Sequence, residues 1–365
     1  MIQSYDVGSL PPTVNSEKFC RLAKSYNSLR RQLYPDEYAY FTDVVLTGFK
    51  DKLDAGVDIP NYPQYRDMNE MFLDMIRGIE KTNGGYVVTD TPSVASGNAK
   101  IQEVSVIREN RHEIRGAIGR PFRLKVCITG PYTLASLFRY RPSGIHENLG
   151  STLSTIVEEN AFDEKDGSVE LVAMDEPVFG FLNDPMLDRG SSGRERLLSA
   201  WDGMLHKVKS KGAKTILHLH NTSDDLFWDL KNLDVIESHV DDPIYKTERT
   251  KQLLNDCDKF LKAPIAVTRF DDLIARKIQS NDSQLAAGEW EKIRKKEADP
   301  MSYLEDVGAM NIRLKKLVDF FGEDRVPYAG LECGLRGHPT YDCAIESLRR
   351  QSLAITNYNN SKTLN

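Results

Sequence analysis

Short apolar runs that end in polar residues alternate along the chain with longer segments whose apolar positions recur at helical spacing. The first pattern is typical of buried strands, and the second is typical of helices that turn one face to a core. Strands are predicted at residues 4–10, 57–61, 85–89, 101–108, 123–128, 168–174, 216–222, 234–237, 264–268 and 328–335. Helices are predicted at residues 17–27, 35–56, 66–80, 194–211, 302–321 and 340–355, and the charged run 289–299 is predicted to be a solvated helix face.

Eight of these strands end in polar loops, and most are separated from the next by a helical segment, which is the order of a (β/α)₈ TIM barrel. The sequence therefore predicts an α/β protein with one domain over residues 1–365 and a small strand insertion near residues 86–108. No low-complexity linker marks a domain boundary. A doubly wound open sheet is the second interpretation, but no G-x-G-x-x-G motif follows an early strand.

Ionisable side chains gather at the carboxyl ends of three predicted strands. His218 and His220 share one face of their strand because side chains alternate along a strand. Glu237 and Cys333 end two further strands. Imidazole, carboxylate and thiolate ligands together favour zinc over metals that prefer oxygen. The alternative for the two histidines is that one is a core residue and the other lies on the surface.

The chemistry expected of such a site is the activation of a thiol. Zinc lowers the pKa of a coordinated sulfur, so that a substrate thiol becomes a thiolate at neutral pH and can attack a methyl group. A site spread over several strand ends of a barrel is more often catalytic than structural. A non-enzymatic protein in which zinc only holds the barrel together is the alternative from another class.

Composition narrows the class of protein. The net charge of −6 and the pI near 5.8 argue against a nucleic-acid-binding protein, which usually presents a basic face. No apolar run is long enough to cross a bilayer, and the first residues lack the pattern of a signal peptide. Five scattered cysteines without a C-x-x-C pair suit reduced thiols in the cytoplasm.

Six short motifs, taken in their order along the chain, resemble the cobalamin-independent methionine synthase family. The resemblance is to the C-terminal catalytic barrel of that family, in the short single-barrel form, and it spans nearly the whole chain. The motifs are Val7-Gly8-Ser9-Leu10-Pro11, Thr129-Gly130-Pro131-Tyr132-Thr133, Met174-Asp175-Glu176-Pro177, His218-Leu219-His220, Val235-Ile236-Glu237 and Glu332-Cys333-Gly334-Leu335.

The resemblance implies an S-methyltransferase that binds Zn²⁺ and converts homocysteine to methionine. The implied zinc ligands are His218, His220, Glu237 and Cys333, with His220 in place of a cysteine of the family. Asp175 would pair with the substrate ammonium and act with the zinc ligands as a catalytic residue. Ser9 and Gln64 would bind the rest of the substrate, and His239 is a weak candidate for support of the ligands.

The departures from the family leave the substrates open. Tyr62 and Gln64 stand where the family has an acidic residue that binds the ammonium, which favours another thiol such as coenzyme M. The methyl donor implied by the short form is a methylated folate or pterin, or a methylated corrinoid protein. A barrel like that of uroporphyrinogen decarboxylase, a metal-free lyase, is the remaining alternative.

Overall fold

The computed structural model describes residues 1–12, 15–181 and 184–363, and in it the chain forms two compact units. The central unit is Arg66–Leu261, and the terminal unit joins Met1–Tyr65 to Lys262–Asn365. The predicted single domain over residues 1–365 stays a prediction, and each unit is described by itself.

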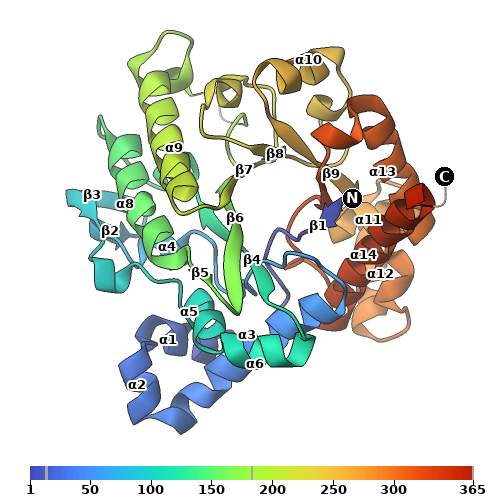
Figure 1. Ribbon diagram of the computed structural model, residues 1–365, viewed down its shortest axis with the longest axis horizontal. Helices are drawn as coiled ribbons and strands as arrows, with labels where there is room; N and C mark the ends of the chain where they lie inside the picture. The colour runs from blue at the N-terminus through green and yellow to red at the C-terminus, as the bar shows by residue number, and fades with distance from the viewer. Residues whose placement is uncertain (13–14, 182–183, 364–365) are drawn as a thin grey trace. The chain divides into compact units, whose positions relative to one another are not determined.

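The central unit is built around parallel strands in the order β4, β6, β7 and β8, followed by the first two residues of β9. Helices α8 and α9 lie side by side (Figure 1), where Gly150 leaves room for Ala200. The elements are α4 (Glu70–Leu73), β2 (Arg77–Thr82), β3 (Gly85–Ser93), α5 (Gln102–Glu109), α6 (Arg111–Ile118), β4 (Phe122–Thr129), α7 (Pro131–Ser136), α8 (Ile145–Asn160), β5 (Asp163–Glu164), β6 (Gly167–Glu176), α9 (Ser192–Ser210), β7 (Lys214–Leu219), β8 (Val235–Glu237) and α10 (Glu248–Asp256).

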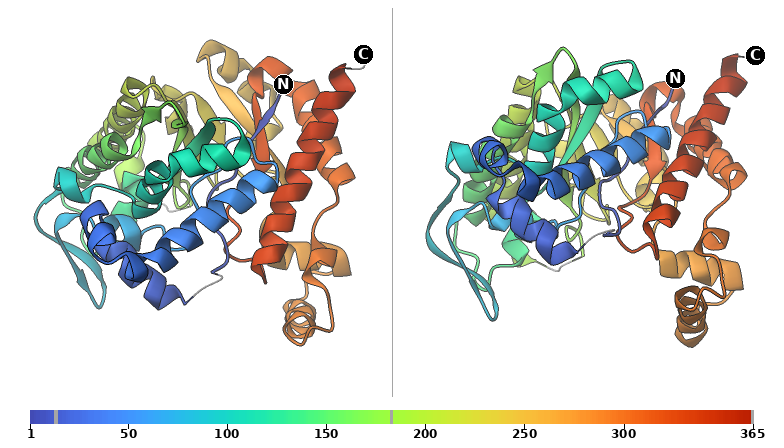
Figure 2. Two further views of the ribbon diagram at one scale, coloured as in Figure 1. Left: turned by 60° about the horizontal axis from the view of Figure 1, so that its bottom comes forward. Right: turned by 90° about the horizontal axis from the view of Figure 1, so that it is seen from below.

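The terminal unit pairs the rest of β9 with β10, and β10 with β1, again in parallel. Helices α3 and α14 lie side by side (Figure 2), and Asn359 near the end of α14 exchanges two hydrogen bonds with the backbone of Ile2. The elements are β1 (Gln3–Ser4), α1 (Ser16–Ser25), α2 (Ser28–Leu33), α3 (Pro35–Asp54), β9 (Phe260–Ala266), α11 (Phe270–Ile278), α12 (Ser283–Arg294), α13 (Val307–Phe321), β10 (Tyr328–Leu331) and α14 (Tyr341–Thr363).

Two predicted elements between residues 66 and 108 are wrong. The helix predicted at 66–80 is only the short α4, because residues 77–93 form the antiparallel hairpin of β2 and β3 around Asn83 and Gly84. An Asn-Gly pair between two strands is a strong hairpin signal. The strand predicted at 101–108 is helix α5, which buries Val104 and Ile107 on one side.

The predicted strand at 57–61 does not form a ladder. It is reduced to an isolated bridge between Tyr5 and Ile59, followed by a second bridge between Ser9 and Gln64. Pro60 and Pro63 have no N–H to donate, so a continuous ladder cannot form here. Seven parallel strands are therefore present in the described part of the chain, and the predicted second strand of the barrel is replaced by these two bridges.

A buried carboxyl group at the end of β6 fixes the start of α7. Glu176 accepts hydrogen bonds from the backbone N–H groups of Tyr132 (2.9 Å) and Thr133 (2.6 Å) and from Nε1 of Trp201 (2.6 Å). Gly130 has no side chain, and a Cβ there would contact the Glu176 carboxylate. Burial raises the pKa of Glu176 to about 7, although the hydrogen bonds act in the opposite direction.

In the terminal unit, a buried lysine fixes two loops by hydrogen bonds. Lys52 of α3 is 0% exposed and donates to Asp6 Oδ2 (2.6 Å), to the carbonyl of Gly8 (2.8 Å) and to the carbonyl of Asn61 (3.1 Å). Asp6 also accepts the N–H of Asn61 through its other oxygen (2.7 Å). One ion pair therefore ties α3 to the loop after β1 and to the loop before Gln64.

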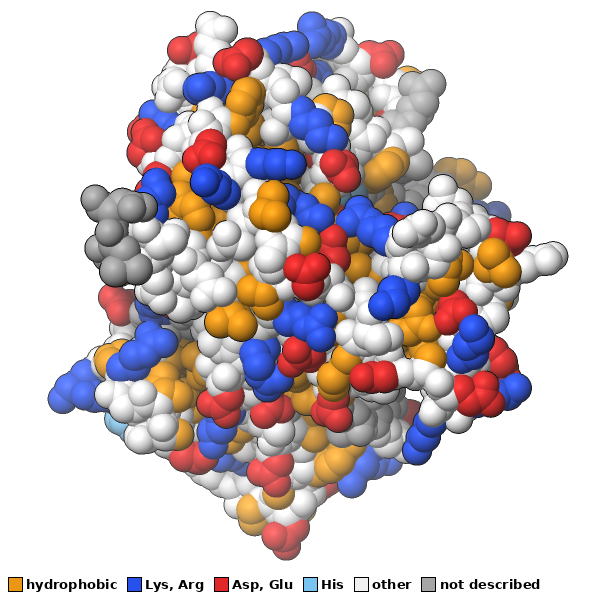
Figure 3. All heavy atoms as spheres, turned by 90° about the vertical axis from the view of Figure 1, so that its right-hand side faces the viewer, with side chains coloured by type: hydrophobic (Ala, Val, Ile, Leu, Met, Phe, Trp, Pro, Cys, Tyr) orange, Lys and Arg blue, Asp and Glu red, His pale blue; other side chains and the backbone are white. Residues whose placement is uncertain are grey.

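The surface carries both signs of charge. On the face shown in Figure 3, acidic and basic side chains are interspersed. Exposed pairs such as Arg294 with Glu291 on α12 contribute little to stability. Within the described residues, no helix combines the length and the apolar character that crossing a membrane requires.

Replacing Lys52 with Met should lower the free energy of unfolding by about 3–5 kcal/mol, because Asp6 is then buried without its counter-ion. Denaturant unfolding measures the loss, and the exposed Lys316→Met on α13 is the control with little expected change. The double variant Lys52→Met/Asp6→Leu should recover part of the stability. A Lys52→Met protein as stable as the wild type would contradict the role of this ion pair.

The pKa of Glu176 predicts a specific pH dependence of stability. Because the folded state raises this pKa from 4.5 to about 7, the folded state binds the proton more strongly, and stability falls as the pH rises from 4.5 to 7. The fall attributable to this group is at most about 3 kcal/mol. Unfolding measured at pH 5 and pH 7.5 should show a smaller difference in Glu176→Gln than in the wild type or in Glu170→Gln. Equal differences in all three proteins would refute the assignment.

Candidate metal and substrate site

Four parallel strands of the central unit align polar residues at their carboxyl ends. Thr129 of β4 pairs in register with Asp175 of β6, Asp175 with His218 of β7, and His218 with Glu237 of β8. Register partners lie side by side, about 4.8 Å apart. Asp175, His218 and Glu237, which were predicted from separate segments of the sequence, are thus brought into one row.

Within this row, the imidazole of His218 faces the carboxylate of Glu237. The Nδ1 atom of His218 lies 3.1 Å from Oε1 of Glu237, and the two side chains are 2% and 1% exposed. Both groups are therefore removed from water. The same short distance suits two atoms that bind one cation, or a carboxylate that accepts the proton of the imidazole.

Two further histidines join His218 just beyond the ends of β7 and β8. The ring centroids of His220 and His239 are 4.1 Å apart, and those of His218 lie 5.1 Å from His220 and 6.2 Å from His239. Ligand nitrogens of the three rings all lie within 4.8 Å of one another. The structure therefore supplies a cluster of three imidazoles, of which the sequence predicted two as ligands.

The environment keeps His220 neutral. Burial, followed by the neighbouring His218 and His239, lowers the pKa of His220 to about 2. A neutral imidazole keeps the lone pair that a metal ion requires. His220 is therefore available at neutral pH as a ligand for a cation.

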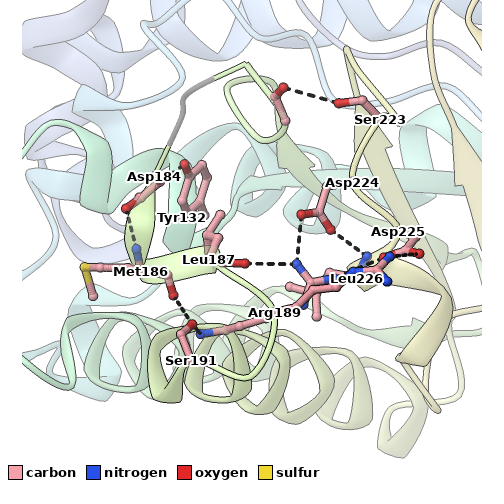
Figure 4. Close-up of polar contacts among 12 residues, drawn as sticks. Tyr132, Asp184, Met186, Leu187, Arg189, Ser191, Ser223, Asp224, Asp225 and Leu226 are labelled. Atoms are coloured by element: carbon pink, nitrogen blue, oxygen red, sulfur yellow. Dashed lines mark hydrogen bonds and ion pairs between the residues drawn. The ribbon is translucent and has the colours of Figure 1, made fainter.

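The loop that follows His220 is anchored to α9 and to the loop before α9 (Figure 4). Asp224 forms an ion pair with Arg194 (2.8 Å), and Asp225 contacts Arg194 (3.2 Å) and Arg189 (2.8 Å). Arg194 also donates to the carbonyl of Leu187 (3.2 Å). These contacts limit the movement of the chain segment that presents His220.

The terminal unit brings three other predicted residues close together. Ser9 forms a parallel bridge with Gln64, and the carbonyl of Ser9 accepts the N–H of Leu335 (2.9 Å). A Cβ on Gly334 would clash with Oγ of Ser9, so a larger residue beside Cys333 would require the Ser9 side chain to move. The loops that carry Ser9, Gln64 and Cys333 are therefore joined within this unit.

Two residues next to the candidate site have structural contacts. Arg66 is buried against Glu103 of α5, with Nε to Oε1 at 2.8 Å. Glu176, next to Asp175 in the sequence, points to α7 and Trp201. Cys333 belongs to the terminal unit and the histidines to the central unit, so its place among the ligands stays a prediction.

His239 joins the cluster from beyond the end of a strand. It stands two residues after Glu237, which by strand alternation would place it on the same face, but β8 ends at Glu237. His239 lies outside the strand, directly before the turn in which Asp241 has a φ of 73°. The spacing of two residues was the only signal available in the sequence.

No family model matches the chain, but individual proteins do. The methionine synthase of Saccharolobus solfataricus is 26% identical over 186 residues, which is 49% of this chain and 52% of that protein. The 5-methyltetrahydropteroyltriglutamate–homocysteine methyltransferase of Thermotoga sp. RQ2 is 22% identical over 181 residues, which is 47% of this chain and 24% of that protein. The chain thus matches about half the length of the first relative and about a quarter of the second.

Solved structures extend the likeness to the whole chain. A B12-independent methionine synthase from Shewanella sp. W3-18-1, in complex with selenomethionine, has a TM-score of 0.62 with 15% identity and covers 100% of both chains. A putative B12-independent methionine synthase from Listeria monocytogenes has a TM-score of 0.58 with 12% identity, covering 98% of this chain and 99% of its own. The predicted α/β barrel class is confirmed by this likeness, and so is the predicted resemblance of the chain to cobalamin-independent methionine synthases.

Proposed function

We propose that this protein is a zinc-dependent S-methyltransferase that methylates the thiol of homocysteine to give methionine. The observation that carries the proposal is the cluster of imidazoles at the carboxyl ends of β7 and β8, beside the carboxylate of Glu237. The likeness to methionine synthases supports it, because those proteins are named for this reaction. Within the described residues the five cysteines form no disulfide, which favours a cytoplasmic location.

His218 and His220 are two of the proposed metal ligands, and Cys333 is a third. The close spacing of the imidazoles and the neutral state of His220 fit a borderline metal such as zinc. When bound, zinc would lower the pKa of a substrate thiol so that the thiolate is present at neutral pH. The resemblance implies Glu237 as the fourth ligand, and His239 lies in the same cluster.

Asp175 is proposed to hold the ammonium group of the substrate. Its carboxylate is 4% exposed and stands next to His218 in the register of β6 and β7. A buried carboxylate beside the metal ligands can orient an amino acid whose sulfur points to the cluster. Ser9 and Gln64 are proposed to bind the remainder of the amino acid, as the resemblance implies.

The proposed donor is a methylated folate or pterin, and a methylated corrinoid protein is the alternative. The name of the Thermotoga relative includes a 5-methyltetrahydropteroyl donor. The sulfur lone pair would form the new S–CH₃ bond while the N–CH₃ bond of the donor breaks. The donor nitrogen keeps that electron pair and takes up a proton, so no covalent enzyme intermediate is required.

A second candidate activity is methylation of another thiol, such as coenzyme M. It is favoured by Gln64, which is buried at 5% exposure where the family has an acidic residue. An amide provides no negative charge for the substrate ammonium, so that group would depend on Asp175 alone.

The first test is zinc content and X-ray absorption at the zinc edge, with and without homocysteine. One equivalent of zinc with one sulfur neighbour from Cys333 is expected, and homocysteine should add a second sulfur. Cys333→Ser should remove the first sulfur and leave the second. If the zinc spectrum is unchanged by homocysteine but changes with coenzyme M, the second candidate activity is supported in place of the first. A protein that binds no zinc would overturn both.

Replacing Asp175 with Asn should raise the KM for homocysteine about 10- to 100-fold, because the ammonium loses a buried ionic partner. The zinc content should stay at one equivalent. Steady-state methylation measured against homocysteine concentration is the readout, and Glu170→Gln on the same strand is the control. An unchanged KM would remove Asp175 from the substrate site.

A further inference from the structure

We propose that His239 is a metal ligand, so that His218, His220 and His239 hold the ion with three imidazoles. In this arrangement Glu237 orients His218 instead of binding the metal. The inference rests on the proposed function, because it concerns the ion that the function requires. It differs from the ligand set implied by the resemblance, which contains Glu237 and omits His239.

The positions of the three histidine rings are the first support for His239 as a ligand. His239 is closer to His220 than His218 is, with centroids 4.1 Å apart against 5.1 Å. Two nitrogens that each bind one zinc ion at about 2.1 Å are at most ~4.2 Å apart. The ligand nitrogens of the three rings all lie within 4.8 Å of one another, so small rotations of the side chains are enough to reach a common ion.

The contact between Glu237 and His218 indicates that Glu237 orients the His218 ring. Its Oε1 lies 3.1 Å from Nδ1 of His218, and a neutral imidazole has one N–H and one lone pair. The two atoms are close but not aligned for a hydrogen bond, so a small rotation of the ring is needed before Nδ1–H donates to the carboxylate. With the proton on Nδ1, Nε2 carries the lone pair for the metal. A carboxylate behind a metal-binding histidine is a common arrangement, and it fixes the tautomer and the ring orientation.

A second carboxylate holds the two histidine-bearing loops in place. Asp242 is 8% exposed; its Oδ2 accepts the hydroxyl of Ser238 (2.9 Å) and its Oδ1 accepts the hydroxyl of Thr222. Ser238 directly precedes His239, and Thr222 follows His220 by two residues. The N–H of Ser238 also donates to the hydroxyl of Tyr245 (2.8 Å). The backbone that presents His239 is therefore fixed to the backbone that follows His220.

The test compares His239→Gln with Glu237→Gln and with His206→Gln, a control on the exposed side of α9. The zinc dissociation constant is measured by competition with a chromophoric chelator, and X-ray absorption counts the imidazoles. His239→Gln should weaken zinc binding at least ~100-fold and reduce the count from three to two. Glu237→Gln should weaken binding only ~10-fold and keep three imidazoles.

Asp242→Asn is the second variant and leaves all three rings present. It should weaken zinc binding about 10-fold without changing the number of imidazoles, because it loosens the loops that carry them. If His239→Gln keeps wild-type affinity and imidazole count while Glu237→Gln loses most of its zinc, Glu237 is the ligand and the inference is overturned, but the proposed function stands. A wild-type protein without zinc affinity would overturn both together.

Discussion

The parallel register of β6, β7 and β8 is the constraint on which the candidate site depends. It makes Asp175, His218 and Glu237 neighbours, although 62 residues separate the first from the last. A slip of one residue in any of these ladders would turn the polar side chain to the opposite face of the sheet. Both faces of β7 are buried, so packing on each side selects the same register. The strands therefore position Asp175, His218 and Glu237, and the loops beyond the strands position His220 and His239.

Buried charges, rather than apolar contacts alone, position the loops around these strand ends. The carboxylate of Glu176 accepts hydrogen bonds from two backbone N–H groups and one indole. The ammonium of Lys52 donates hydrogen bonds to one carboxylate and two carbonyls. Burying such groups is costly unless each is fully hydrogen-bonded. A directional bond fixes a loop more closely than an apolar contact does, since it fails when the loop shifts by about 1 Å. The same reasoning applies to Asp242 between its two loops.

The sequence predicted most of the parallel strands, and it predicted the longer helices whose apolar positions recur at helical spacing. Helix α9, predicted at residues 194–211, buries Leu197, Trp201 and Leu205 at helical spacing. Residues 101–108 could not be decided in this way, because a short apolar run fits a strand or a helix equally well. The hairpin at residues 77–93 could have been predicted from its Asn-Gly pair. The position of His239 could not be predicted, because the alternation of side chains ends where β8 ends. Beyond that point the backbone is held by side-chain contacts such as those of Asp242.

Two proposed departures of this chain from the related synthases each remove one negative charge, because His220 would replace a thiolate and Gln64 an acidic residue. With His220 as a ligand, the proposed metal would hold a substrate thiolate more tightly and lower its pKa further. The nucleophilicity of a thiolate falls with its pKa, so the same change would slow its attack on a methyl group. The proposed reaction would then depend on alignment, and the register that places Asp175 beside His218 would supply it.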